Sequence, residues 1–466
     1  MSPDPHARPL SADPHARPLS ADPQYRPLSA GQQMIWTAHR VAPQSSAYVI
    51  AVALRIRGEL RTDALATAVD ALVARHELLG SVVVEDAGRP RFAPAPDTGR
   101  VLRVEDLPDE GEEAFLAAVR DRCREGFAPA EEPMVRVTVL RRPGQEAALV
   151  LTAHHMISDY ASQHVMLREL LEDHHALLAT GGLPPRPAAF PYRTYVAEER
   201  GLPGTPAAER AEAHWRSVCE GSEPIGLALD RPRPAVPGYR GGTVELDLTE
   251  DEFAEVRERA ALAGTIPFGY LLGLFQAALY RYTGRRDFLI GVPVSQRRRR
   301  ADAVGYFAST VPLRAGFAPG TTVRDAVQSV GRQLGEARTH ARHPVTPPLR
   351  VALTMITTDR QLPVLDHVPA GTPYGPEREY LGLRISRIGI SQQEGQLDLV
   401  VRLEESGGAL KAVFAYDGDL LDRATVQRIA DYFGRLLDRA AADTRIDDIR
   451  LADRTDLADL LALGQG

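Results

Sequence analysis

Hydrophobic positions in the first half of the chain follow two different periods. Short apolar runs at residues 47–56, 134–140 and 147–154 predict buried strands. From Thr62 onward, and again over residues 159–178, apolar side chains recur every three or four positions, which predicts amphipathic helices. Strands that alternate with such helices indicate an α/β lobe, because each helix can cover one face of a sheet.

The second half repeats this alternation. A Thr249-Glu-Asp-Glu252 sequence has the form of a capping box and predicts the start of a helix. The expected strands are 243–248, 288–292, 397–403 and 410–416, and the expected helices are 267–282, 323–340 and 423–441. Stretches rich in Pro, Gly and charge at 183–191 and 202–237 separate the halves, so the sequence predicts two α/β lobes with a boundary near residue 200 and a ligand-binding cleft between them.

The N-terminal segment differs from both lobes. A nine-residue unit, DPHARPLSA, begins at Asp4, recurs at Asp13 and returns in a changed form at Asp22. Each copy has two prolines and no apolar periodicity, which predicts a disordered tail over residues 1–26. The predicted organisation is therefore a tail at 1–26, a first lobe at 27–200 and a second lobe at 201–466.

Composition narrows the class of protein. Hydrophobic residues make up 44% and charged residues 25% of the 466 positions, as in an ordinary globular protein, and the net charge of −7 disfavours a nucleic-acid partner. Cys123 and Cys219 allow at most one disulfide and no four-cysteine metal site. The chain shows neither a signal-peptide pattern nor a membrane-spanning apolar run, so we expect a cytoplasmic protein without a membrane partner.

The strongest cluster of reactive side chains is His154-His155-Met-Ile-Ser-Asp159-Tyr160, where an apolar strand ends and a helix begins. A neutral imidazole at this point can accept a proton from an attacking hydroxyl or amine. The alternative is a pair of structural histidines, because a His pair with one carboxylate is a weak motif. A zinc site is disfavoured, since adjacent residues on extended backbone point in opposite directions and no third ligand has a characteristic spacing.

This segment resembles the HHxxxDG motif of the condensation domains of nonribosomal peptide synthetases. Other segments resemble further motifs of that superfamily in the same order, namely LSAGQQMIW at 28–36, RHELL at 75–79, FPYRTY at 190–195, IGVPVSQR at 290–297 and VGYFASTVPLR at 304–314. The resemblance implies two chloramphenicol-acetyltransferase-like α/β lobes that form a V-shaped pseudo-dimer with an active-site tunnel between them.

The resemblance also implies roles for single residues. His155 is the expected catalytic residue and His154 a structural one, while Asp159 is expected to pair with Arg75 beneath the motif. The implied reaction transfers an acyl or aminoacyl group from a thioester on the phosphopantetheine arm of an acyl- or peptidyl-carrier protein to a small-molecule alcohol or amine. No bound cofactor and no metal are expected.

Three features depart from the pattern or extend it. Tyr160 replaces the motif glycine, and its ring either reshapes the acceptor side of the tunnel or packs into the core. Ser309 replaces the usual asparagine and, with Tyr306, is expected to line the tunnel. The cationic run 297–300 suits a phosphate of the pantetheine arm or an acidic carrier surface, and a solvated loop is the alternative.

The sequence leaves several functions open. A free-standing condensation enzyme is favoured, because no segment resembles a carrier or an adenylation domain, and ester-forming relatives occur in enediyne antibiotic biosynthesis. A non-catalytic domain that recruits a tailoring enzyme is disfavoured by the intact pair of His154 and His155. A coenzyme A-dependent acyltransferase shares HHxxxD, but the chain has no DFGWG-like segment. Nothing in the motif separates ester from amide synthesis.

Overall fold

The computed structural model describes residues 24–450, apart from residues 44, 100, 236, 299, 344–347, 358–361, 367 and 370. The predicted tail lies outside the described residues up to position 23. Its last residue, Arg26, belongs instead to a short strand, β1 (Arg26–Pro27), which pairs with β4 (Arg89–Pro94). Ordered structure therefore begins before the predicted first-lobe boundary at residue 27.

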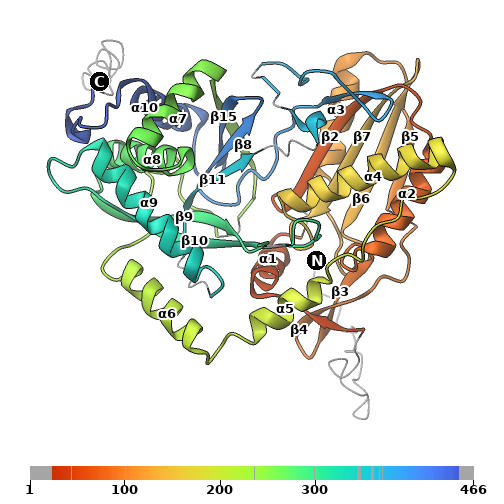
Figure 1. The fold of residues 1–466 in the computed structure, drawn as a ribbon, viewed down its shortest axis with the longest axis horizontal. Coiled ribbons are helices and arrows are strands. Elements are labelled where there is room, and N and C mark those ends of the chain that lie inside the picture. Colours follow the sequence, from red (N-terminus) through yellow and green to blue (C-terminus); the bar gives the residue numbers. More distant parts are fainter. Residues whose placement is uncertain are drawn as a thin grey trace, which may run out of the picture.

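Two lobes lie side by side, each built on a six-stranded sheet (Figure 1). The first lobe has a sheet of order β12-β13-β2-β7-β6-β5 and a small sheet of order β1-β4-β3. Its elements are α1 (Ala30–Val41), β2 (Val49–Arg57), α2 (Thr62–Arg75), β3 (Ser81–Asp86), β5 (Leu102–Asp106), α3 (Glu112–Arg124), β6 (Val135–Arg142), β7 (Glu146–His154), α4 (Tyr160–Thr180) and α5 (Tyr192–Arg200).

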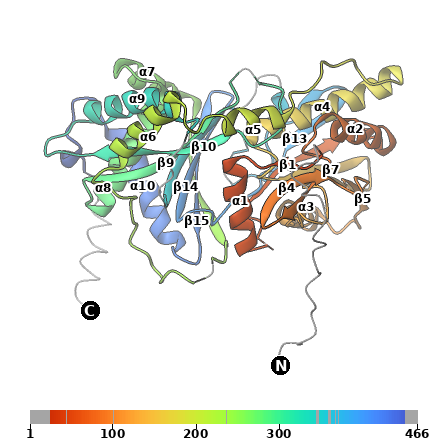
Figure 2. The ribbon, with the colours of Figure 1, turned by 90° about the horizontal axis from the view of Figure 1, so that it is seen from below.

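The second lobe has a sheet of order β10-β9-β11-β14-β15-β8. Its elements are α6 (Pro206–Cys219), β8 (Gly241–Leu248), α7 (Glu250–Leu262), α8 (Pro267–Thr283), β9 (Asp287–Ser295), β10 (Ala308–Gly316), α9 (Val323–His340), β11 (Val351–Thr357), β14 (Leu399–Ser406), β15 (Ala409–Asp417) and α10 (Arg423–Arg439), with 3-10 turns at Pro363–Leu365 and Ile446–Asp448. Figure 1 shows α5 at the lower edge of the first lobe and α6 below the second, and Figure 2, seen from below, shows the two helices in succession across the molecule. The chain therefore crosses between the lobes at the connection between these two helices.

Alternation along the strands explains how both lobes are layered. In β2, Val52 and Leu54 join the core beneath α2 and α4, while Ala51 and Ala53 join a smaller core beneath α3. The apolar core of the second lobe lies on one side of its sheet, under α7, α8 and α10. The other side of the sheet faces the first lobe, so the polar residues of that side are placed in the cleft.

The caps explain where several helices begin. The predicted capping box is present, since Thr249 Oγ1 accepts from the backbone N–H of Glu252, and Glu252 Oε2 accepts from that of Thr249. Asp159 caps α4 by accepting from the backbone N–H of Ser162. No single described helix is long and apolar enough to cross a membrane, although α7 and α8, which meet at 93°, reach that length and composition together.

Two segments of the second half enter the first lobe, which departs from the predicted contiguous division at residue 200. Strand β13 (Leu383–Arg387) pairs antiparallel with β2, and β12 (Arg378–Tyr380) pairs with β13 at the edge of the first-lobe sheet. Val304 and Phe307, from the connection between β9 and β10, are buried in the first-lobe core. The lobes are therefore not contiguous in sequence, because these segments of the second half pair with a first-lobe strand or pack in the first-lobe core.

Candidate active site

Backbone geometry sends the two adjacent histidines in opposite directions. His154 is the last residue of β7 and pairs with Val49, and the backbone N–H of His155 donates to Tyr48 O at 2.7 Å. Successive side chains on extended backbone alternate between faces. His154 is accordingly buried in the first lobe, whereas His155 lines a cavity between the lobes.

The surroundings of His155 keep its ring neutral and leave Nε2 free to accept a proton. Its Nδ1 lies 2.8 Å from Ser158 O, and because a carbonyl oxygen can only accept, Nδ1 carries the proton and Nε2 keeps a free electron pair. Burial lowers the pKa of His155 below 6.5, outweighing the opposing effects of the Ser158 carbonyl and Asp159. The ring also packs edge-on against Tyr306, with 5.0 Å between ring centroids. A neutral, oriented imidazole can therefore take a proton through Nε2.

His154 has a packing environment. Its Nδ1 accepts from the backbone N–H of Met156 at 3.2 Å, and its ring lies edge-on to His39 and Phe127. Burial lowers the pKa of His154 to about 3, so the ring is neutral and is held inside the lobe. Among the described residues, no group of three or more His, Cys, Asp or Glu side chains could hold a metal ion.

Asp159 joins the two lobes beneath the motif, but its cationic partner is not the predicted one. Arg297 Nη2 lies 2.5 Å from Asp159 Oδ1, and the backbone N–H of Phe307 donates to Oδ2 at 3.2 Å. Arg75 instead forms an ion pair with Glu169 at 3.2 Å, so the predicted Asp159–Arg75 pair is wrong. Asp159 is occupied by four donors in all, counting the backbone and hydroxyl of Ser162, which fixes it as a positioning group.

The predicted cationic run is largely committed to the protein itself. Arg297 is buried against Asp159, and Arg300 Nη2 donates to both carboxylate oxygens of Glu198, at 2.6 and 2.7 Å. Arg298 is exposed, and Arg299 lies outside the described residues. The guanidinium groups of Arg297 and Arg300 therefore do not form the phosphate or carrier surface that was one interpretation of the run.

Three adjoining cavities lie along the space between the lobes. The His155 cavity, of about 340 Å³, is bounded by α4, β9, β11 and β14 and by the segment 392–396. The Ser309 cavity, of about 140 Å³, shares Ala308 with it, and Tyr306 and Ser309 line this second cavity. A third cavity, of about 270 Å³, shares Gln392, Arg402 and Glu404 with the His155 cavity. The His155 cavity therefore shares wall residues with two further cavities, Ala308 with one and Gln392, Arg402 and Glu404 with the other.

Tyr160 stands in the wall of the His155 cavity. It is the first residue of α4, is half-buried, and packs against His164 with ring centroids 4.4 Å apart. Burial raises the pKa of Tyr160, so its hydroxyl stays protonated at neutral pH. The Tyr160 ring thus borders the cavity and also packs against its own helix. The other departure from the motif, Ser309, has a buried Oγ that makes no hydrogen bond among the described residues.

Sequence reasoning missed the residues opposite His155. Val400, Arg402 and Glu404 alternate along β14 on the side that faces the cavity. Gln392 and Gln396 belong to the segment that crosses back from the first lobe; Gln392 Oε1 accepts from the backbone N–H of Ala51, and Gln396 Nε2 donates to Ala47 O. The alternation of apolar and charged residues over 401–404 was the available signal, because charges at every second position of a buried strand must face a polar space.

Sequence similarity to known proteins extends over almost the whole length of this chain. The condensation-domain family model matches residues 23–461. A linear gramicidin synthase of Brevibacillus parabrevis is 31% identical over 426 residues, covering 88% of this chain and 8% of that protein. Phosphinothricin tripeptide synthetase PhsB of Streptomyces viridochromogenes is 31% identical over 452 residues, covering 91% of this chain and 36% of that protein. The chain thus spans less than half the length of these relatives.

Solved structures with low sequence identity have the same fold. The X-domain from teicoplanin biosynthesis has a TM-score of 0.77 at 23% identity, and the match covers 92% of this chain and 98% of the X-domain chain. SgcC5 of Streptomyces globisporus, solved with a naphthyl ethanediol and sucrose, has a TM-score of 0.73 at 24% identity and covers 90% of this chain and all of its own. The mixed α/β fold in two chloramphenicol-acetyltransferase-like lobes is the fold of these structures.

Proposed function

Because this chain belongs to the condensation-domain family, we propose that it transfers an acyl or aminoacyl group from a thioester on the phosphopantetheine arm of a carrier protein to an alcohol or amine. The observation that carries the proposal is the neutral His155 ring, whose Nδ1 proton is held by Ser158 O and whose Nε2 is left as a base at the cavity between the lobes. The family carries out acyl transfer of this kind, and the identity of the acceptor is part of the proposal.

The proposed step moves one proton twice. Nε2 of His155 accepts the proton of the acceptor hydroxyl or amine as its oxygen or nitrogen attacks the thioester carbonyl. When the tetrahedral intermediate collapses, the new C–O or C–N bond remains, the C–S bond breaks, and the proton passes from His155 to the departing pantetheine thiolate. General-base catalysis of this kind contributes about 10² to 10⁴ in rate.

The remaining catalysis is assigned to positioning. Tyr160 and Ala161 begin α4 and border the His155 cavity, so the partial positive charge of the helix N-terminus faces the reacting carbonyl. Asp159 holds that helix start against the second lobe through Arg297. Both lobes must therefore be in place before a substrate held at His155 is aligned.

Both substrates are proposed to arrive from opposite sides of His155. The Ser309 cavity and the third cavity adjoin the His155 cavity through different wall residues, Ala308 on one side and Gln392, Arg402 and Glu404 on the other. This arrangement supports an entry for the carrier-bound donor and a separate entry for the acceptor. An acyl- or peptidyl-carrier protein is the proposed macromolecular partner.

Product formation tests the proposal directly. Carrier protein loaded with a range of acyl and aminoacyl groups, or the matching acyl-coenzyme A, is offered to amine and alcohol acceptors paired by carbon skeleton, and products are measured by mass spectrometry. We expect carrier-dependent product with the wild type and a loss of about 10² or more in rate with His155→Ala. His175→Gln, at an exposed position on the same helix, is the matched control and should retain activity.

The outcomes separate the candidate functions. Preference for the alcohol or the amine distinguishes ester from amide synthesis, including the ester formation known from enediyne pathways. Equal use of acyl-coenzyme A would indicate a coenzyme A-dependent acyltransferase. Folded protein that gives no product with any donor would contradict the proposal and favour a non-catalytic domain that recruits another enzyme.

A further inference from the structure

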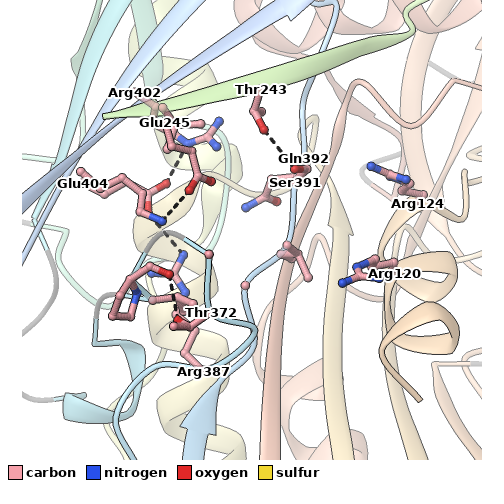
Figure 3. A pocket seen from close by; sticks show the side chains of 17 residues that line it. Arg120, Arg124, Thr243, Glu245, Thr372, Arg387, Ser391, Gln392, Arg402 and Glu404 are labelled. Atoms are coloured by element: carbon pink, nitrogen blue, oxygen red, sulfur yellow. Dashed lines mark hydrogen bonds and ion pairs between the residues drawn. The ribbon is translucent and has the colours of Figure 1, made fainter. Parts of the chain in front are cut away.

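The third cavity between the lobes is strongly cationic. We call it the cationic cavity; it lies between α3 of the first lobe and β8, β14 and β15 of the second, under the segment 387–392 (Figure 3). Five cationic side chains and two carboxylates line it, which leaves a surplus of three positive charges: the cations are Arg120, Arg124, Arg387, Arg402 and Lys411, and the carboxylates are Glu245 and Glu404.

The carboxylates of this cavity are already paired. Glu245 lies 2.9 Å from Lys411, while Glu404 lies 3.0 Å from Arg402 and 3.7 Å from Arg387. At the base of the cavity, two carboxylates are therefore paired with three cationic side chains. The field of these cations is weakly screened, since the side chains of Arg402 and Lys411 are each only 8% exposed.

The first lobe adds two further cations at the rim. Arg120 and Arg124 are one helical turn apart on α3 and are exposed, and Figure 3 shows both on the side of the cavity opposite Arg402. Arg124 lies 3.7 Å from Glu394, which balances part of its charge. Gln392 accepts from Ala51 through Oε1, so its amide nitrogen remains to donate to a ligand.

The cationic cavity is close to the chemistry. It shares Arg402, Glu404 and Gln392 with the His155 cavity. Tyr160, which replaces the motif glycine, borders the His155 cavity and interacts electrostatically with Arg387, Glu404 and Arg402. A substrate whose reacting group is at His155 can therefore extend a second group past Tyr160 toward these cations.

We propose that the cationic cavity binds a carboxylate carried by one of the two substrates, at a position remote from the bond that forms. The inference rests on the proposed transfer at His155. Arg402 and Lys411 supply the buried positive charge, and Arg120 and Arg124 close the site from the first lobe. An uncharged substrate would leave the three cations at the base with only two carboxylates, so one positive charge there would lack its own counter-ion, which is unfavourable.

Matched pairs of substrates test the inference and identify the source of the carboxylate. In the donor arm, succinyl-loaded carrier is compared with butyryl-loaded carrier; in the acceptor arm, amino and hydroxy acids are each compared with their primary amides. We expect kcat/KM to be at least tenfold higher for the carboxylate in one arm. The double variant Arg120→Gln/Arg124→Gln should reduce that ratio several-fold, while Arg122→Gln, on the same helix but paired with Glu105, should leave it unchanged.

A binding measurement keeps the inference testable without turnover. Succinyl-pantetheine and butyryl-pantetheine, which lack the phosphate of the arm, and the acid and amide acceptors are titrated into the full chain by calorimetry. Tighter binding of one carboxylate member, weakened by the double variant, supports the inference. Equal binding within every pair overturns it, as does an equal loss of kcat/KM for acid and neutral substrates in the variant, which a contact with the arm phosphate would give. Absence of transfer with carboxylate binding intact rejects only the proposed function.

Discussion

Two neighbouring histidines are both held neutral in this protein, but by different surroundings. His155 keeps its proton on Nδ1 because Ser158 O accepts it, and His154 stays neutral because burial excludes its charged form. The two residues are adjacent in sequence, but their rings have different surroundings. Their effects on the pH dependence of activity and of stability should therefore be separable.

The activity should have an acidic limb set by His155. Burial lowers its pKa from 6.5, so the unprotonated Nε2 persists below that pH and is lost only as the pH falls through the lowered pKa. We expect the midpoint of the acidic limb of kcat/KM to lie below pH 6.5, measured with a donor and acceptor that do not titrate in that range. A midpoint above pH 6.5 would contradict a buried neutral base.

Stability should depend on His154 over a different range. Its pKa is about 3 in the folded chain and near 6.5 when unfolded, so the unfolded state binds the proton more readily. The contribution of His154 is fully present above pH 6.5 and is lost as the pH falls from 6.5 toward 3, by up to about 1.4 kcal/mol per pH unit. His154→Asn keeps an acceptor for Met156 but does not titrate, so urea unfolding at pH 7.5 and 5.0 should show a smaller acid loss than in the wild type.

The sequence could predict those parts of the site that depend on neighbouring residues, but not those that depend on residues far apart along the chain. The orientation of His154 and His155 follows from local strand geometry, and the cap at Asp159 follows from its place before α4. The partner of Asp159 could not be found this way, because Arg297 comes from the other lobe and reaches Asp159 only when the connection between β9 and β10 enters the first lobe. The catalytic role of His155 and the tunnel roles of Tyr306 and Ser309 remain predictions.

At the scale of elements, the start of α4 is attached to the second lobe by one buried ion pair. Asp159→Asn leaves the Arg297 guanidinium without its counter-ion, which should cost about 3–5 kcal/mol in the free energy of unfolding. Arg297→Met together with Asp159→Asn should restore part of that loss in a double-mutant cycle. Asp106→Asn, at an exposed pair with Arg141, is the control and should change stability far less; an equal loss would contradict the importance of burial.

The close approach of α1 to Tyr306, in the connection that precedes β10, also fixes the position of a ring beside His155. A Cβ added at Gly31 would lie 2.5 Å from Tyr306 Cε1, and Tyr306 packs against His155. Gly31→Ala should therefore displace Tyr306, lower kcat/KM and cost about 1–3 kcal/mol of stability through overpacking. Gly335→Ala, in α9 with open space at its Cβ, is the matched control and should be neutral or slightly stabilising.

Element prediction succeeded where one face of a segment is buried and failed where a segment is defined by distant partners. The periodic helices 159–178 and 423–441 correspond to α4 and α10. Strands β12 and β13 were not predicted, because the five-residue β13 pairs with β2, more than 300 positions earlier, and the three-residue β12 pairs in turn with β13. Helix α3 was missed within a charged loop region, since only Phe115, Leu116, Val119 and Cys123 mark its buried face.

At the scale of the whole molecule, exchanged segments make the two lobes depend on each other. Strand β13 completes the first-lobe sheet, and Val304 and Phe307 fill its core, although all three are connected to second-lobe strands. The Asp159–Arg297 pair adds a buried electrostatic contact between them. The lobes should therefore unfold together, even though each has its own six-stranded sheet.

The chain provides a tryptophan in each lobe to test this. Trp36 packs against the first-lobe core and Trp215 is buried in the second, and these are its only tryptophans. Single-tryptophan variants, Trp36→Phe and Trp215→Phe, report the second and the first lobe respectively. We expect each variant to show the same urea midpoint by fluorescence as by circular dichroism. Midpoints that differ between the two methods would show that the lobes unfold separately.

The cationic cavity also carries a spectroscopic label. Lys411, at its base, is the only lysine in all 466 residues. Isotopic labelling of lysine would thus place a single NMR resonance between the lobes, with no assignment required and no other side chain to overlap it. Any ligand, proton or domain movement that alters the field at the base of the cavity would be recorded by the frequency of one ammonium group.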